Sequence, residues 1–135
     1  MGWSIPSIIG WVKSKGDIKK LSHYHKKIAS LYNDGKLDEK DIEPIDKLSI
    51  NIADSYSKGK INNEHYTNLK DEISVLYHQI YDKKIDSLNH SFSFAERINS
   101  LQIIKNDIAD LYSKGKIKEL HYHMLKEKLL DFEQK

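Results

Sequence analysis

Histidine is the residue type in this chain that could most readily bind a metal ion or move a proton, and four of the seven histidines form two close pairs. These pairs are His23 with His25 and His121 with His123. On an α-helix, residues two apart point about 200° away from each other, so neither pair can hold one ion. Glu119 and His123 have the four-residue spacing that places two ligands on one helix face. No third ligand completes that pattern, and we expect no metal site.

Other residue patterns that carry catalysis do not occur in the sequence. The chain has no cysteine, which excludes disulfides, thiolate metal sites and cysteine catalysis. It has no glycine-rich phosphate loop, no Gly-x-Ser-x-Gly nucleophile and no His-Glu-x-x-His helix. We therefore expect that the protein is not an enzyme and needs no cofactor. A histidine-rich metal-binding or pH-sensing module stays an alternative, in which the melting temperature shifts with zinc or with pH between about 5 and 7.

A ten-residue phrase that occurs three times predicts the architecture. It reads IASLYNDGKL at residues 28–37, IADSYSKGKI at residues 52–61 and IADLYSKGKI at residues 108–117. In the last copy, Ile108, Leu111 and Tyr112 have the spacing of one apolar helix stripe. Gly115 then supplies the left-handed residue that commonly ends a helix. A second apolar pattern follows, so each copy predicts a helix, a glycine stop, a tight turn and another helix.

Each predicted turn is marked by one glycine and by tyrosines on either side of it. The residues expected to define the hairpins are Gly35, Gly59, Gly115, Tyr32, Tyr56, Tyr66, Tyr112 and Tyr122. Tyrosine stands three residues before each glycine and again seven after the last two, whereas Ile42 has that second place in the first copy. We expect the two positions to meet across the turn. His65 and His121 share the place six residues after their glycines, which favours a common packing role.

Apolar spacing and capping residues predict five antiparallel helices. These helices cover residues 17–35, 38–58, 63–89, 93–115 and 118–132. The predicted N-caps are Asp17, Asp38, Asn62 and Ser93, whereas Lys118 is a poor cap. Pro44 lies past the first turn of the second helix, so we expect a kink or a short prelude there.

The third helix carries the spacing of a coiled-coil seam. The seam residues are Tyr66, Leu69, Ile73, Leu76 and Ile80. We expect this long helix and the one that follows it to form a spine. The predicted fold is an all-α, extended antiparallel bundle of about five helices, built from three helix-glycine-turn-helix repeats.

The last repeat resembles the SHOCT (short C-terminal) domain. The resemblance lies in GKIKELHY at residues 115–122, followed by Leu125, Lys126, Lys128, Leu129 and Leu130. SHOCT domains are small helical hairpins, often found at the ends of membrane-associated proteins and thought to mediate oligomerisation. The resemblance implies a hairpin fold and a role in association. The chain differs from that family in having three copies, a lysine at Lys118 in place of a Ser or Thr cap, and a long helix between copies two and three.

The first fifteen residues, MGWSIPSIIGWVKSK, differ from residues 16–135, which form the predicted bundle. The residues expected to contact a membrane or a partner are Trp3, Ile5, Ile8, Ile9 and Trp11, with Lys13, Lys15, Lys19 and Lys20 after them. Tryptophan favours the bilayer interface, but the apolar run is shorter than the roughly 20 residues that span a bilayer. Residues 1–15 are expected either to anchor shallowly in a membrane or dock on a membrane protein, or to pack their tryptophans on the bundle.

The charge pattern gives little support to nucleic-acid binding. The net charge is +2, and Arg97 is the single arginine among 22 basic residues. Arginine is the residue best suited to bidentate phosphate and base contacts. A small nucleic-acid-binding protein stays an alternative that requires salt-dependent duplex binding. The sequence favours a non-enzymatic helical interaction or scaffold module, cytoplasmic or membrane-peripheral, such as an accessory subunit of a membrane protein complex, which binds a protein partner or itself.

Overall fold

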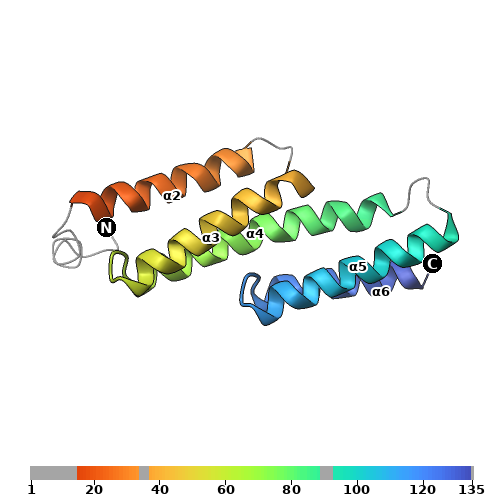
Figure 1. Cartoon of the computed structure of the whole chain (residues 1–135). Coiled ribbons are helices and arrows are strands. Elements are labelled where there is room, and N and C mark those ends of the chain that lie inside the picture. The colour runs from red at the N-terminus through yellow and green to blue at the C-terminus, as the bar shows by residue number, and fades with distance from the viewer. Residues whose placement is uncertain (1–14, 34–36, 89–92, 135) are drawn as a thin grey trace.

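The computed structural model describes residues 15–33, 37–88 and 93–134, and all of the regular structure in these residues is helical. The helices are α2 (Lys15–Asn33), α3 (Ile42–Ser57), α4 (Asn63–Ser87), α5 (Phe94–Ser113) and α6 (Glu119–Glu133), with a short 3-10 helix (Glu39–Asp41) before α3. Figure 1 shows them as an elongated bundle. The prediction of an all-α, extended antiparallel bundle of about five helices is confirmed.

Three of the four predicted N-caps are observed. Asn62 accepts a hydrogen bond from the backbone N–H of His65, Ser93 from that of Glu96, and Asp38 from that of Lys40. Asp38 caps the 3-10 helix, which is the short prelude expected before Pro44. Pro44 is therefore the third residue of α3, where a missing N–H costs no helical hydrogen bond.

The predicted start of α2 was wrong by two residues. The helix begins at Lys15, so Asp17 lies inside its first turn and is not the N-cap. An acidic residue is favoured throughout the first turn because the helix dipole is positive there. The residue type alone therefore does not distinguish a cap from a position inside the helix.

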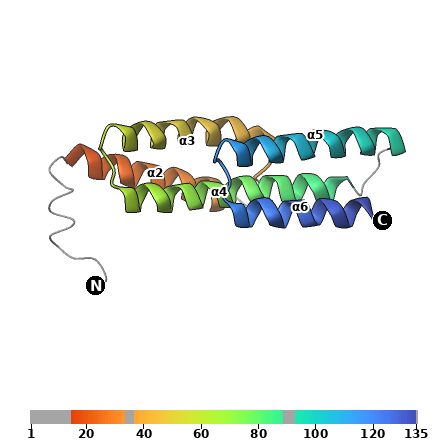
Figure 2. The same ribbon diagram turned by 90° about the horizontal axis from the view of Figure 1, so that it is seen from below.

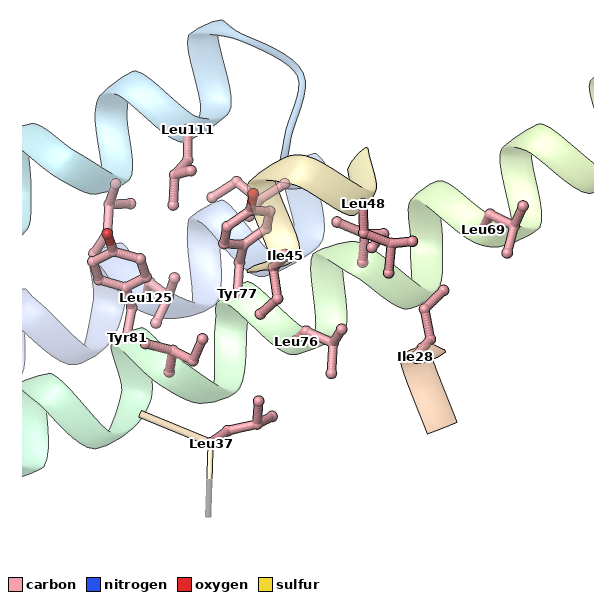
Figure 3. Close-up of a cluster of buried hydrophobic side chains, with 14 of the residues drawn as sticks. Ile28, Leu37, Ile45, Leu48, Leu69, Leu76, Tyr77, Tyr81, Leu111 and Leu125 are labelled. Carbon is pink, nitrogen blue, oxygen red and sulfur yellow. The ribbon is translucent and has the colours of Figure 1, made fainter. Parts of the chain in front are cut away.

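Helix α4 is the axis of the molecule. Figures 1 and 2 show α2 and α3 along its first half and α5 and α6 along its second half. α4 buries the predicted seam residues Leu69, Ile73, Leu76 and Ile80, and it also buries Ser74, Tyr77, Tyr81 and Ile85 on a second face. In Figure 3, Tyr77 and Tyr81 project from α4 toward Leu111 of α5, while Leu76 points away from that side. A helix with neighbours on both sides needs two apolar faces, and the predicted seam is only one of them.

The arrangement around α4 shows a longer repeat than the ten-residue phrase. The stretch YHKKIASL at residues 24–31 recurs as YDKKIDSL at residues 81–88, with six of eight residues identical. The phrase at residues 52–61 recurs at residues 108–117, 56 residues later, with nine of ten identical. Two successive elements thus repeat at nearly the same interval. We call α2, α3 and the first half of α4 the first unit, and the second half of α4, α5 and α6 the second unit.

An ion pair occupies the same place in both units. In the first unit, His25 of α2 lies 3.2 Å from Glu72 of α4. In the second unit, Asp82 of α4 lies 2.7 Å from Lys128 of α6. Asp82 is the counterpart of His25 and Lys128 that of Glu72, so the acidic and basic partners are exchanged while the contact is kept. α4 is therefore both the last helix of the first unit and the first helix of the second.

Candidate functional site

The glycine turns have the geometry that the repeated phrase predicts. Gly59 and Gly115 both have φ of 72°, the left-handed conformation that glycine adopts without a Cβ clash. The N–H of Lys60 donates to the carbonyl oxygen of Ser55 at 2.8 Å, and the N–H of Lys116 donates to that of Leu111 at 2.9 Å. These bonds satisfy carbonyl groups at the ends of α3 and α5. The third predicted turn glycine, Gly35, lies outside the described residues.

Tyrosine pairs meet across both described turns, as expected. The rings of Tyr56 and Tyr66 stack with centroids 4.0 Å apart, and those of Tyr112 and Tyr122 stack at 4.1 Å. The ammonium group of a lysine lies over the second ring of each pair, namely Lys70 over Tyr66 and Lys126 over Tyr122. Such stacks stabilise the hairpins beyond simple burial. Of the first copy's pair, Tyr32 is half exposed, and Ile42 packs against the core.

The start of α6 is held by α4 instead of by a cap of its own. Lys118, the N-cap residue, makes no side-chain cap hydrogen bond. Its backbone N–H donates to Ser74 Oγ at 2.9 Å, and Ser74 Oγ also lies 2.6 Å from Nδ1 of His121. The side chain of Ser74 thus joins α4 to the first turn of α6. His121 is buried, as its place beside the turn requires.

A second polar contact ties the turn of the second unit to the first unit. Asp46 of α3 accepts a hydrogen bond from the hydroxyl of Tyr77, which is fully buried in α4. Lys116 Nζ donates to the same carboxylate at 3.1 Å. Burial and the Asp46 carboxylate raise the pKa of Tyr77 well above its usual range, so its hydroxyl stays protonated. These contacts and those of Ser74 attach the turn after α5 to α3 and α4.

The histidine pairs point to different partners. His123 is exposed and lies 3.4 Å from Glu119 on the same helix, whereas His121 faces α4. His23 is exposed, whereas His25 contacts Glu72. Among residues 15–33, 37–88 and 93–134, no three His, Asp or Glu side chains come together as a metal site.

A hollow lies between α2 and α3. It has a volume of about 650 Å³, and Lys27, Lys40 and Lys47 are among its lining residues. Lys47 pairs with Glu43 at 3.3 Å, and the hydroxyl of Tyr24 is already bonded to Ser55 at 2.6 Å. The hollow offers no buried polar group aimed into it, so nothing in it identifies a ligand.

A groove runs between the two helices of each glycine hairpin. In the first unit it lies between α3 and α4, is lined by Ile52, Tyr66, Lys70 and Ile73 among others, and has a volume of about 160 Å³. The turn residues Lys114, Gly115 and Lys116 form part of its wall. A Cβ placed on Gly115 would lie 3.9 Å from Lys70 Nζ, so this turn sits directly against the groove.

The corresponding groove of the second unit lies between α5 and α6 and is open. Its lining includes Ile108, Tyr122, Lys126 and Leu129, the counterparts of the four residues named for the first groove, together with Lys105, Leu130 and Glu133. Its volume is larger, about 290 Å³, and among the described residues its lining comes from α5 and α6 alone. Lys105 and Glu133 form an ion pair of 2.5 Å beside it. We call these two hollows the first-unit groove and the second-unit groove.

Most of the expected membrane or partner contacts fall outside the described residues. This holds for Trp3, Ile5, Ile8, Ile9, Trp11 and Lys13. Lys15 and Lys19 lie in α2, and Lys20 of the same helix is exposed. None of the helices in the described ranges is both long and apolar enough to cross a membrane.

The sequence pattern predicts the glycines and tyrosines of the turns but not the roles of Ser74, Asp46 and Tyr77. The missing cap at Lys118 was a signal that this helix start needs a partner from elsewhere, but it did not say which residue that partner is. In comparisons with protein-family models, curated proteins and solved structures, nothing matches this chain, so its resemblance to SHOCT domains stays a prediction.

Proposed function

We propose that this protein is a non-enzymatic helical interaction module that binds another protein chain through its second unit and lies near a membrane through its tryptophan-rich N-terminal residues. The observation that carries this proposal is that, among the described residues, the second unit exposes more large apolar side chains than the first. The first unit exposes Tyr32, Ile50 and Tyr56, and the second exposes Phe94, Ile98, Ile103, Tyr112, Leu120, Met124 and Leu130. Ile103, Leu120 and Met124 are 50%, 58% and 46% exposed on the second unit. Their counterparts in the first unit are Lys47, Glu64 and Asn68.

The internal repeat makes this difference informative. Both units have the same helices and the same turn, so the fold does not require apolar residues at these places. Exposed apolar side chains that gather on one part of a protein mark contact sites. The polar groups around the turns are engaged in contacts within the chain, as Ser74, Tyr77 and Asp46 are. The exposed apolar side chains of the second unit support a role in binding.

The membrane part of the proposal is tested by co-sedimentation with vesicles of phosphatidylserine and phosphatidylcholine. We expect the full chain to pellet with these vesicles and a Trp3→Ser/Trp11→Ser variant to stay in the supernatant, because tryptophan supplies the interfacial burial. A Leu120→Glu/Met124→Asn variant, which carries the residues of the first unit, is the matched control and should still pellet. If the tryptophan variant pellets as well as the full chain does, the N-terminal residues are not the anchor.

A pH-responsive module is the second candidate, and one buried and two partly buried histidines favour it. Burial lowers the pKa of His65, His78 and His121 below the usual 6.5. Each of these histidines has titratable or charged neighbours. Glu64 and His25 lie near His65. Asp82 and Lys128 lie near His78. His78, Lys118 and Asp71 lie near His121. The rings of His78 and His121 have centroids 5.0 Å apart, so a charge on either one disfavours a charge on the other.

The melting temperature is expected to fall as the pH is lowered from 7 toward 5. The folded state binds protons less readily than the unfolded state at these three histidines. Their contribution to stability is therefore complete above pH 6.5 and is lost as the pH falls from there through the lowered pKa values. Thermal unfolding followed by circular dichroism at several pH values in this range gives the slope of the melting temperature against pH. His121→Asn should make the slope shallower, whereas His23→Asn, at an exposed site, should leave it unchanged. Equal slopes for the two variants would contradict the role of His121.

A further inference from the structure

We propose that the second-unit groove binds the Lys58–Gly59–Lys60 turn of another copy of this chain, so that copies associate head to tail. This inference rests on the proposed interaction function and names its partner. It does not depend on the membrane part of that proposal.

The chain already contains one example of the contact. The turn Lys114–Gly115–Lys116 lies against the first-unit groove, next to Lys70. It is held there by Lys116 on Asp46, at 3.1 Å, and by the hydrogen bond from the N–H of Lys118 to Ser74. A glycine turn is therefore an occupant that fits a hairpin groove of this shape.

The same chain carries a second turn that lies against no such groove within the described residues. Residues 58–61 read KGKI, identical to residues 114–117, and Gly59 has the same φ of 72° as Gly115. No atom of the described residues comes within 4 Å of a Cβ placed on Gly59. The turn of the first unit is thus built like the docked turn but is free of such a groove.

The second-unit groove is lined by residues that correspond to those of the first-unit groove. Four lining residues correspond to those of the first-unit groove, including a tyrosine and a lysine in the same places, Tyr122 and Lys126. Leu130, 51% exposed, replaces Ser74 and offers an apolar contact in place of a hydrogen bond. Gln102 replaces Asp46, but Glu133 stands where Tyr77 is and lines the groove. An incoming Lys60 would share this carboxylate with Lys105, which pairs with it at 2.5 Å.

The turn and the groove both carry charged groups. Lys58 and Lys60 flank the glycine of the free turn, and Lys58 pairs with Asp54 at 3.1 Å. The groove lining includes Lys105, Lys126 and Glu133, whereas Glu127 lies on α6 outside that lining. Glu127 is the counterpart of Asp71, which lies 3.7 Å from Lys118 in the contact within the chain. Turn and groove are different surfaces at opposite units, so the contact is heterologous. A heterologous contact that does not close into a ring produces a growing series of oligomers and not a single dimer.

The experiment is sedimentation velocity of the full chain over a range of concentrations, together with two variants that each disable one surface. Lys60→Ala removes a cation from the free turn, and Leu130→Arg adds a cation to the groove. We expect the full chain to form oligomers that lengthen with concentration, and each variant alone to stay at the 15.8 kDa of a single chain. An equimolar mixture of the two should form a dimer and nothing larger, since one variant keeps a working groove and the other a working turn.

The outcomes separate this inference from the function on which it rests. A single chain mass for the unmodified protein at all concentrations overturns the self-association, while vesicle binding still tests the proposed function. If Leu120→Arg, at an exposed position of α6 outside the groove lining, abolishes association and Leu130→Arg does not, the second unit binds through another surface and the groove assignment is wrong. Loss of association in Trp3→Ser/Trp11→Ser alone would identify the N-terminal residues as the occupant. Failure of the mixture to form a dimer contradicts the head-to-tail geometry.

Discussion

Replacement of Leu76 by alanine is expected to lower the free energy of unfolding by about 3 kcal/mol. Leu76 is 0% exposed in the part of α4 where the two units join, so the lost methyl groups leave a cavity between packed helices. Chemical denaturation followed by circular dichroism measures this loss. Because α4 belongs to both units, we also expect α2 and α5 to lose hydrogen-exchange protection together.

Leu130→Ala is the matched control for that result. It makes the same chemical change at a half-exposed position of α6, so the expected change is within about 0.5 kcal/mol. A loss below about 1 kcal/mol for Leu76→Ala would mean that the core relaxes around the cavity. Two separate unfolding transitions would show that α4 does not couple the units.

Asp46→Ala is expected to cost about 2 kcal/mol, the second largest effect. The change removes the acceptor of the buried Tyr77 hydroxyl and the partner of Lys116 in one step. An unsatisfied buried hydroxyl costs more than the net value of the hydrogen bond it has lost. Denaturant unfolding of the single variant gives the total cost.

A double-mutant cycle with Tyr77→Phe separates the two contributions. In the Tyr77→Phe background there is no hydroxyl that Asp46→Ala could leave without an acceptor. Asp46→Ala should therefore lower the free energy of unfolding by about 1 kcal/mol less than it does when Tyr77 is present. Gln102→Ala tests the counterpart position, where the side-chain amide donates to Asn106 on the same helix, and should change stability by less than about 0.5 kcal/mol. Additive costs in the cycle would mean that Tyr77 does not depend on Asp46.

The features that the sequence predicted correctly are determined by neighbours close in the chain. The left-handed Gly59 and Gly115, the stacked tyrosines and the cap at Asn62 each involve residues at most ten positions apart. Local spacing is sufficient for these because a helix and its turn have fixed geometry. The same holds for the number of helices, which follows from the apolar stripes between the turns.

The features that escaped prediction depend on which helices become neighbours. Ser74 lies 44 residues from Lys118, and nothing in the sequence around either residue links them. The second buried face of α4, with Tyr77 and Tyr81, was missed because the seam pattern describes one stripe and assumes solvent opposite it. The repeat of YHKKIASL was missed because its second copy lies inside the long helix and does not precede a glycine turn.

The continuity of α4 also sets how the two units are oriented about the long axis. Each residue in a helix adds a rotation of about 100° and a rise of about 1.5 Å, so a single inserted residue between the units would swing the α5–α6 hairpin by more than a quarter turn. Lys116 would then no longer face Asp46, and the first-unit groove would lose its turn. An insertion of seven residues, close to two full helical turns, nearly restores the original rotation of the α5–α6 hairpin about the helix axis. The length of this one helix is therefore a constraint on how such a chain can change while keeping both units in contact.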